Sequence, residues 1–392
     1  MPVPIAAWVL IGAALLLALL SLRGDRERAL YASRRLNERL DDSACPPATV
    51  IVPVKGNDDH LAANLASLAA LDYPDYELIV AARDAADIPP RVLPERARVV
   101  IAGPGDARTG EKINNLLAAV EAVRPESRIF AFADSDNTVT PEWLRALAAP
   151  LAEPGVGLAT GYRWHTPAEP RLWPLLRSVW NSVIAGGFHG GANTFAWGGA
   201  MAITRENFAR CDVPGHWRGA ISDDFQISRA VQAARLAIAW APGATVADRS
   251  STTGGVFFSW IERQMIITRV YRRRLWSIAI VAHVVYCGAM AAAAVWAPLL
   301  LLVQIALGMV KGANRAAIAR ACLPAEEPFF ARWGWIYTWL VPAATWIWLY
   351  SLVAAARTNI IEWRGVRYRL ERDGRQVERD GRQVERVGGG GV

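Results

Sequence analysis

Hydrophobic positions along the chain fall into two long blocks, one towards each end, with a patterned stretch between them. The first block, residues 4–22, is an uncharged run about as long as the hydrocarbon core of a bilayer requires. A secretory signal peptide is the alternative, but the first residues carry no Lys or Arg and no small-residue cleavage site follows. The next segment, 23–35, is basic, so we predict a retained transmembrane anchor over 1–24, its basic flank on the cytoplasmic side, and a linker or interfacial helix over 25–45.

The second hydrophobic block occupies residues 276–356 and predicts further membrane segments. Pro298 divides its first part into a tight pair of spans, and a third segment follows near 332–355. Basic residues at 272–274 and at 363–372 both read as cytoplasmic flanks. An even number of crossings would satisfy both flanks, which leaves open that one of the three segments is re-entrant or lies in the interface.

Between the blocks, residues 46–275 show short β-branched runs that alternate with segments of helical apolar spacing. The expected strands are 48–54, 76–84, 97–104 and 128–136, and the expected helices are 58–71 and 112–123. Strands that alternate with helices predict an α/β domain with a parallel sheet. Ligands of such sheets bind at the carboxyl ends of the strands, where Asp84 and Asp134 both fall.

Composition narrows the class of partner. The chain has 53% hydrophobic residues and a formal net charge of +7, and its basic residues gather near the apolar segments and in the tail, 357–392. This placement favours anionic lipid headgroups, and no motif predicts a nucleic-acid partner.

The four cysteines have no C-x-x-C spacing, so neither a zinc site nor a disulfide framework is expected. The end of the tail, 371–392, is charged and glycine-rich, and we expect it to be disordered and without a catalytic role.

Two carboxylates, Asp134 and Asp136, follow the apolar strand pattern directly. Like charges this close repel each other, so a cation is expected between them. Paired carboxylates suit Mg²⁺ or Mn²⁺, which keep coordination positions for a substrate's phosphates. The alternative is the start of a helix, although Thr140 as N-cap and Pro141 at the first helical position would explain that helix without the aspartates.

Three further segments contain candidate binding groups. Asp223 and Asp224 precede a helical pattern, which makes them either a general base with its neighbour or a capped helix start. Lys112 and the amides of Asn114 and Asn115 begin another helix, where they either contact phosphate or ribose or form an ordinary solvated turn. The Gly-Gly pair at 198–199 is either a close approach of backbone to ligand or a simple turn.

Seven segments, taken in order along the chain, carry a resemblance to a known family. They read IVPVKG, RDAAD, GEKINNL, ADSDN, GGAMAITRE, SDDFQISRAV and ERQMIITRVYR. The series resembles family-2-type glycosyltransferases of the GT-A fold and is most similar to the ceramide glucosyltransferase branch, which includes bacterial enzymes that glycosylate ceramide or hopanoid lipids. The resemblance covers about residues 46–275 and the flanking membrane segments. It implies a Rossmann-like α/β domain with a mixed, mostly parallel sheet, helices on both faces, and transmembrane helices at both ends.

The resemblance also implies roles for individual aspartates. Asp84 would help to hold the uridine nucleotide, and Asp134 with Asp136 would bind the metal and the sugar nucleotide. Asp224 occupies the place of the catalytic base, with Asp223 as its acidic neighbour.

Arg263 opens the element that reads (Q/R)xxRW in the family and closes over the diphosphate and acceptor. This chain departs from that element, because Ile266 and Ile267 replace its second Arg and its Trp. Arg269 lies just beyond but is expected on a different face of the helix. The departure weakens the resemblance to standard ceramide glucosyltransferases. It weakens the resemblance to processive polysaccharide synthases more.

The resemblance implies a membrane-bound inverting hexosyltransferase, with Mg²⁺ or Mn²⁺ as cofactor and a UDP-sugar as donor. The acceptor would be a lipid hydroxyl of the ceramide kind, which would place the enzyme in sphingolipid metabolism. A multi-pass location in a bacterial inner membrane, with the catalytic domain in the cytoplasm, would follow. Two alternatives stay open: transfer to a polyprenyl phosphate or hopanoid lipid, with residues 269–274 as partner of an anionic acceptor, and a catalytically silent lipid-binding membrane protein.

Overall fold

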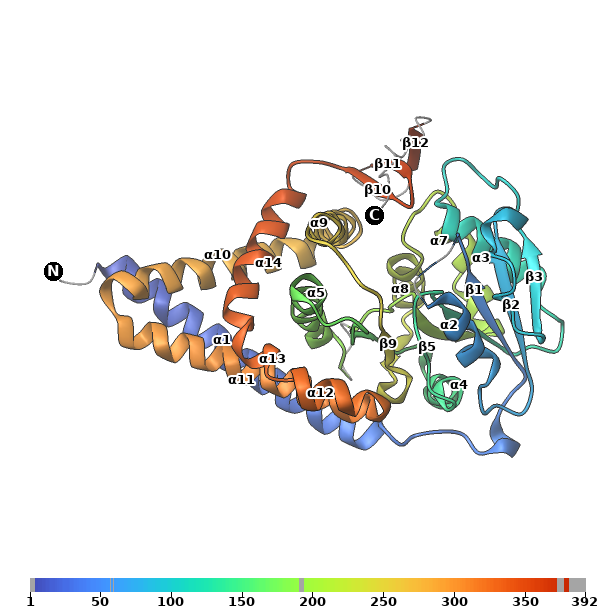
Figure 1. Cartoon of the computed structure of the whole chain (residues 1–392), viewed down its shortest axis with the longest axis horizontal. Coiled ribbons are helices and arrows are strands. Elements are labelled where there is room, and N and C mark those ends of the chain that lie inside the picture. Colours follow the sequence, from blue (N-terminus) through green and yellow to red (C-terminus); the bar gives the residue numbers. More distant parts are fainter. Residues whose placement is uncertain (1–3, 57, 59, 190–193, 372–376, 381–392) are drawn as a thin grey trace.

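The computed structural model describes residues 4–56, 58, 60–189, 194–371 and 377–380. Its centre is a seven-stranded sheet with the strand order β3-β2-β1-β4-β7-β5-β8 (Figure 1). The strands are β1 (Ala48–Pro53), β2 (Tyr76–Ala82), β3 (Ala97–Ile101), β4 (Ile129–Ala133), β5 (Val156–Thr160), β7 (Ala200–Thr204) and β8 (Ala237–Trp240). All neighbours are parallel except β7, which is antiparallel to both β4 and β5. The mixed, mostly parallel sheet predicted from the sequence is therefore confirmed.

Helices cover both faces of this sheet because its strands are apolar on both sides. In β1, Val50 and Val52 belong to the core cluster that contains α2 and α4, whereas Ile51 belongs to the cluster that contains α3 and α8. Side chains alternate between the two faces of a strand, and burial on both faces is typical of parallel sheets. The helices of the domain are α2 (Leu61–Ala69), α3 (Glu111–Glu121), α4 (Trp143–Ala148), α5 (Leu172–Ser182), α6 (Arg205–Arg210), α7 (Val213–Trp217) and α8 (Asp223–Ala233).

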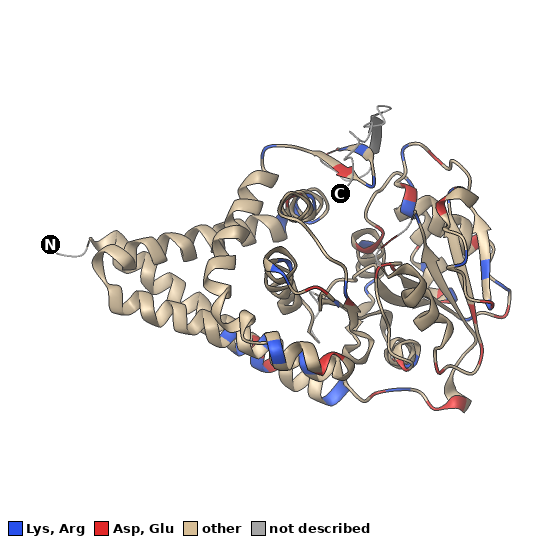
Figure 2. Ribbon diagram, in the orientation of Figure 1, with Lys and Arg blue, Asp and Glu red and all other residues tan. Residues whose placement is uncertain are grey.

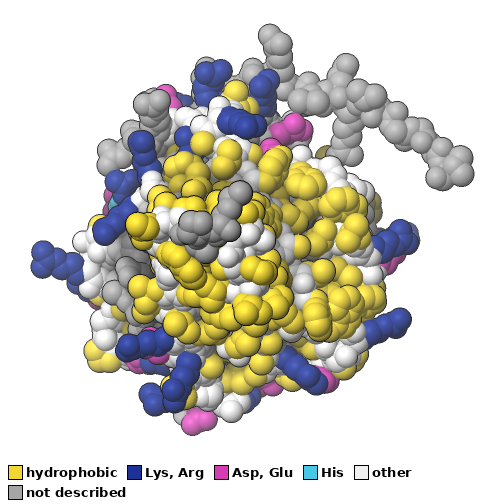
Figure 3. All heavy atoms as spheres, turned by 90° about the vertical axis from the view of Figure 1, so that its left-hand side faces the viewer, with side chains coloured by type: hydrophobic (Ala, Val, Ile, Leu, Met, Phe, Trp, Pro, Cys, Tyr) yellow, Lys and Arg dark blue, Asp and Glu magenta, His cyan; other side chains and the backbone are white. Residues whose placement is uncertain are grey.

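Three long apolar helices project from the domain as a bundle (Figure 1). They are α1 (Ile5–Arg35), α10 (Arg273–Trp296) and α11 (Pro298–Cys322), and each is long and apolar enough to cross a membrane. The break predicted at Pro298 is confirmed, and this proline begins α11, where its missing N–H costs no hydrogen bond. The tip of the bundle presents a hydrophobic surface, with Lys and Arg side chains around its margin (Figure 3), and almost all charge lies away from the tip (Figure 2).

The third predicted C-terminal segment is divided in the structure. It contains α12 (Glu327–Trp333), α13 (Ile336–Trp339) and α14 (Val341–Ala355). At 15 residues, α14 is about 22 Å long, shorter than a hydrocarbon core of about 30 Å. Because α10 leads away from the domain and α11 returns to it, the basic flanks before and after these helices lie at the same end of the bundle (Figure 1).

The remaining elements connect the domain to the bundle and frame the site. They are β6 (Arg163–His165), β9 (Val246–Asp248), α9 (Gly254–Tyr271), β10 (Ile360–Trp363), β11 (Val366–Leu370) and β12 (Val377–Asp380). Strands β6 and β9 pair in parallel, and β10, β11 and β12 form a small antiparallel sheet.

Two local predictions need correction. Residues 377–380, expected to be disordered, form β12, because an antiparallel partner in β11 offers backbone hydrogen bonds; the rest of that prediction lies outside the described residues, apart from Glu371, which is not in a strand. The helix expected to begin at Pro141 begins at Trp143 instead, and no side chain caps it. Thr140 offers its carbonyl to the Trp143 N–H but does not act as the predicted cap.

Candidate active site

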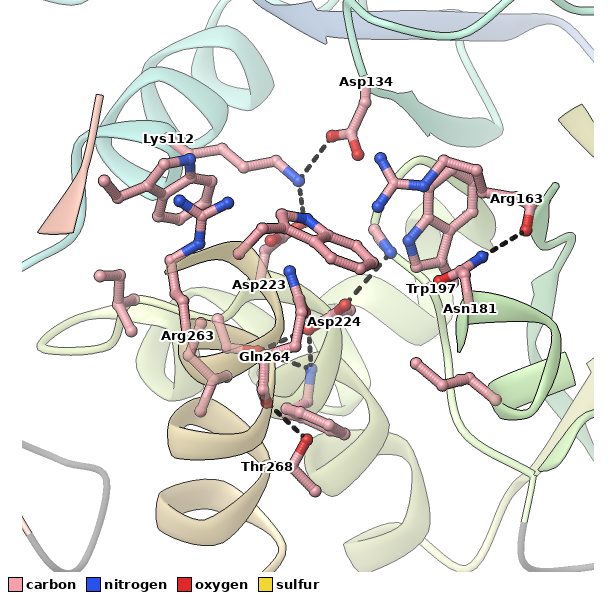
Figure 4. Close-up of a pocket in the computed structure, with 18 of the residues that line it drawn as sticks. Lys112, Asp134, Arg163, Asn181, Trp197, Asp223, Asp224, Arg263, Gln264 and Thr268 are labelled. Atoms are coloured by element: carbon pink, nitrogen blue, oxygen red, sulfur yellow. Dashed lines mark hydrogen bonds and ion pairs between the residues drawn. The ribbon is translucent and has the colours of Figure 1, made fainter. Parts of the chain in front are cut away.

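A cavity of about 670 Å³ lies where the carboxyl ends of β1 and β4 face α8, α9 and the β10–β11 hairpin. Its polar wall contains most of the side chains singled out in the sequence, and Figure 4 shows how they converge. The charged side chains that line it include Asp58, Lys112, Asp134, Asp136, Arg163, Asp223, Asp224, Asp248, Arg263 and Arg364. The cavity thus occupies the position at which parallel sheets bind ligands.

Lys112 joins three elements at the floor of the cavity. Its Nζ lies 2.8 Å from Oδ1 of Asp134, which follows β4, and 3.0 Å from Oδ2 of Asp223, which begins α8 (Figure 4). All three side chains are largely buried. Burial would lower the pKa of Lys112, but the two carboxylates outweigh burial and raise it, so the ammonium stays charged.

Asp136 belongs to a second network of charged side chains, which contains Arg163 and Asp248. Its Oδ2 lies 3.3 Å from Nη1 of Arg163, and the same Nη1 lies 3.4 Å from Oδ2 of Asp248. His165 Nδ1 is 2.9 Å from that oxygen, and burial lowers the pKa of His165 to about 3, so the imidazole is neutral. Protein side chains therefore provide cations beside both aspartates of the 134–136 pair.

The two aspartates differ in their electrostatic state. Burial would raise the pKa of Asp134, but the charge of Lys112 and its hydrogen bond outweigh burial and lower that pKa. Burial raises the pKa of Asp136 to about 7, since the charge of Arg163 does not offset the loss of solvent and the nearby Asp248 opposes ionisation. A further cation at this position would favour the charged form of both.

The acidic pair lies at a capped helix start, and its role as a general base stays a prediction. Ser222 is the N-cap, and its side chain accepts a hydrogen bond from the Phe225 N–H, so the capped helix start is present. Asp224 also lines the cavity; its Oδ1 accepts from the Ser222 hydroxyl at 2.5 Å and from the Phe225 N–H at 2.7 Å. From the described residues, its Oδ2 receives one long contact, of 3.4 Å, from the Gly198 N–H.

The Gly-Gly pair allows the protein's own carboxylates to approach the backbone. A Cβ at Gly198 would lie 2.6 Å from Asp223 Oδ2 and 3.0 Å from Lys112 Nζ, and a Cβ at Gly199 would lie 2.7 Å from Asp134 Oδ2. Any side chain here would displace the network around Lys112. The missing side chains of this pair therefore let Lys112, Asp134 and Asp223 lie close to the backbone.

A model of the family described as Glycosyl transferase family 21 matches residues 7–376. The chain belongs to this family. It is similar in structure to a mannosyltransferase from Pyrobaculum calidifontis in complex with GDP-Man and Mn²⁺, with 17% identity over 88% of this chain and 97% of that one and a TM-score of 0.48. It is also similar to glucosyl-3-phosphoglycerate synthase from Mycobacterium tuberculosis in complex with Mn²⁺, UDP and phosphoglyceric acid, with 19% identity over 60% of this chain and 79% of that one and a TM-score of 0.38.

Two residues predicted to contact the nucleotide do not line the cavity of this family 21 glycosyltransferase. Asp84 lies two residues beyond the end of β2 with a side chain 64% exposed, and it pairs with Arg83. Asn114 turns away and bonds to the backbone of Asp106 through both its amide nitrogen and its oxygen. The neighbouring Asn115 faces the cavity instead. One position along a helix rotates a side chain by about 100°, which the sequence pattern did not resolve.

The altered (Q/R)xxRW element lies on α9 and only part of it faces the cavity. Arg263 does so (Figure 4). Ile266 is buried in the core cluster between α9 and the hairpin, and Ile267 lines the apolar part of the cavity. Arg269 is absent from the cavity lining and donates to the Thr358 carbonyl at 2.8 Å. Ile266 does not line the cavity either, so the position of Arg269 on another helix face stays a prediction.

Several cavity residues of this family 21 chain were not recognised in the sequence. Arg163 lies 5.3 Å from the Trp197 ring and 5.8 Å from the Trp260 ring, within the range of cation–π contacts. Arg364 reaches the cavity from the C-terminal hairpin. An isolated Arg carries no local signal, and only a conspicuous strand-turn-strand pattern around Arg364 would have drawn attention to it.

The aspartate pair fits a divalent cation. Asp136 Oδ1 is buried and has no hydrogen-bond partner, which leaves one carboxylate oxygen available for coordination. Among the described residues no group of three or more His, Cys, Asp or Glu side chains is arranged to hold a metal. Such a cation would therefore take ligands from two carboxylates and from a substrate's phosphates, which is how Mg²⁺ is commonly held.

Away from the charged floor, the same cavity has an apolar wall built by α10 of the bundle together with α9 and α14. Its residues are Ile267, Leu275, Trp276, Ala279, Trp348 and Leu352. The cavity therefore connects the carboxylates of the sheet to α10, which is long and apolar enough to cross a membrane.

Proposed function

We propose that this family 21 glycosyltransferase is a membrane-bound inverting enzyme that moves a hexose from a UDP-sugar to the hydroxyl of a ceramide-like lipid. The observation that supports this most is the single cavity with a charged floor and an apolar wall. A nucleotide sugar needs cations and carboxylates, whereas a lipid acceptor needs an apolar surface that continues towards the bilayer. Both requirements meet in one space at the base of the bundle.

In this proposal the charged groups divide the work between donor and acceptor. Lys112 holds Asp134 in its charged form, and Arg163 offsets only part of the cost of burying Asp136. A Mg²⁺ or Mn²⁺ ion bound there would favour the charged form of both and would bind the nucleotide's phosphates. When bound, the ion supplies Lewis-acid stabilisation of the departing diphosphate. Asp224 takes the proton of the acceptor hydroxyl, whose oxygen attacks the anomeric carbon as the bond to UDP breaks. A single displacement inverts the configuration.

The acceptor is proposed to be neutral. Residues 269–274, the alternative partner of a polyprenyl phosphate, do not line the cavity as described, and Arg272 donates to Gln232 Oε1 at 2.9 Å.

The location follows from the bundle: we propose a bacterial inner membrane, with the catalytic domain and the basic flanks on the cytoplasmic side.

Filling the apolar wall tests the acceptor. Ala279→Phe places a ring in the cavity and is expected to lower kcat/KM for a ceramide-like acceptor by at least about tenfold, while UDP binding is unchanged. The purified full chain is incubated with a panel of UDP-sugars and with ceramide, hopanoid and polyprenyl phosphate acceptors. The mass of the product identifies the acceptor, and the rate of product formation at varied acceptor concentration gives kcat/KM. Val281→Phe on the same helix, at a position 62% exposed, is the control. Equal acceptor kinetics in both variants would contradict the assignment of the wall.

Removing divalent cations tests the donor site. The affinity of the full chain for UDP is expected to fall by at least about tenfold in a chelator, because the buried carboxylates then repel the phosphates. Uridine, which has no diphosphate, is the control and should bind equally in both conditions. Equal affinity for UDP with and without the ion would remove the metal from the proposal.

A further inference from the structure

The C-terminal hairpin is an anchored part of the fold although it lies far along the chain from the site. Ile361, Tyr368 and Leu370 are each no more than 3% exposed and share a core cluster with residues of α9 and α14. Figure 1 shows β10 and β11 beside α9. Trp363, Arg364 and Tyr368 line the catalytic cavity, so the hairpin forms part of its wall.

The turn of this hairpin has an unusual residue at its tip. Trp363 pairs with Val366, which leaves Arg364 and Gly365 as a two-residue loop with φ values of 49° and 74°. A two-residue loop with both φ values positive is typical of a type I′ turn, for which Asn-Gly is the preferred sequence. Arg in the left-handed region is disfavoured relative to Asn. The left-handed backbone of Arg364 is a conformational outlier beside the cavity, and such outliers often occur at functional residues.

The guanidinium of Arg364 is directed at the end of β1 and the aspartate pair. It lies 2.8 Å from Asp58 and donates to the Lys55 carbonyl at 2.6 Å. Asp58 in turn accepts a hydrogen bond from the hydroxyl of Ser135, the residue between the two aspartates. Asp58 therefore orients Arg364 beside the proposed metal site.

A second arginine faces the same region from α9. Arg263 lies 5.6 Å from the Trp363 ring and donates to the Glu362 carbonyl at 3.3 Å, and no carboxylate lies within ion-pair distance of it in the described part of the chain. Burial, with Arg163 and Arg364 nearby, lowers its pKa to about 10. Two arginines held together in a cavity without full compensation fit an anionic ligand.

We infer that Arg364 is a donor-binding residue that, with Arg263, contacts the diphosphate of the nucleotide sugar from the hairpin side of the cavity. This inference rests on the proposed function. Arg163 is a weaker candidate for the same role because its Nη1 already lies between Asp136 and Asp248. The side chain of Arg364 is 34% exposed and, among the described residues, has one carboxylate partner, so it can contact a phosphate while Asp58 holds it in place.

Arg364→Asn separates binding from folding, because Asn removes the charge and suits the turn better than Arg. With the full chain in nanodiscs and Mn²⁺ present, calorimetry should show that UDP binds about tenfold more weakly or worse, while uridine affinity and Tm do not fall. Arg369→Gln, an exposed substitution on the same hairpin, should bind UDP as the wild type does.

The possible failures are distinguishable. A wild-type chain that does not bind UDP would overturn the proposed function and this inference with it. A wild type that binds UDP and an Arg364→Asn variant of equal affinity would overturn the inference alone. Loss of uridine and UDP affinity together, or a lowered Tm, would show that Arg364 acts through the fold and would equally overturn it.

Discussion

Asp224→Asn is expected to lower sugar transfer by about a thousandfold while the affinity for the UDP-sugar stays near that of the wild type. The reason lies in how the carboxylate is held. Oδ1 is fixed by Ser222 and by the Phe225 N–H, whereas Oδ2 receives one long contact and faces the cavity. Asn keeps the shape of this group but cannot accept a proton from the acceptor hydroxyl at neutral pH.

The neighbouring residues give two controls for this prediction. Ser222→Ala removes the N-cap and is expected to cost about 1 kcal/mol of stability. Transfer should fall less than in Asp224→Asn, because the Phe225 N–H still holds Oδ1 and the carboxylate remains. Asp223→Asn disturbs the ion pair with Lys112, so its loss should appear in Tm as well as in rate. Transfer measured as labelled product per enzyme, beside equilibrium binding of the UDP-sugar, separates these cases. Near-normal transfer by Asp224→Asn would exclude it as the base.

Lys112→Met is expected to be the most destabilising single change at the site, with a loss of about 3–5 kcal/mol in the free energy of unfolding. Without the ammonium, Asp134 and Asp223 remain buried near each other with no shared cation. Burial raises the pKa of Asp223 to about 6 even with Lys112 present. Thermal unfolding of the full chain in one detergent, without added metal, provides the measurement.

A matched lysine and a double variant make this prediction specific. Lys55 pairs with Glu111 at 2.8 Å but is more exposed than Lys112, so Lys55→Met should cost about 1 kcal/mol or less. Adding Asp223→Asn to Lys112→Met removes one of the stranded charges and should restore part of the stability. If Lys112→Met is no less stable than Lys55→Met, the ion network does not hold the floor of the site together.

The sequence by itself determined the elements and the chemical type of the site. Short continuous apolar runs predicted β1, β2 and β4, and the long apolar blocks predicted α1, α10 and α11, because both signals depend on neighbouring residues in the sequence. The same local logic placed Asp134 at the end of β4 and the 222–224 segment at a helix start. These positions follow from where an apolar pattern stops, and that point can be read directly from the sequence.

Only the tertiary structure decided which groups meet. Asn114 and Asn115 are neighbours on one helix, yet packing of α3 against the sheet turns only Asn115 to the cavity. Arg163, Asp248 and Arg364 reach the aspartates from distant parts of the chain. Local propensity carries no information on such contacts. They form because burial of the apolar faces of helices and sheet fixes the packing, and this packing places the charged side chains at the edges of those faces near one another.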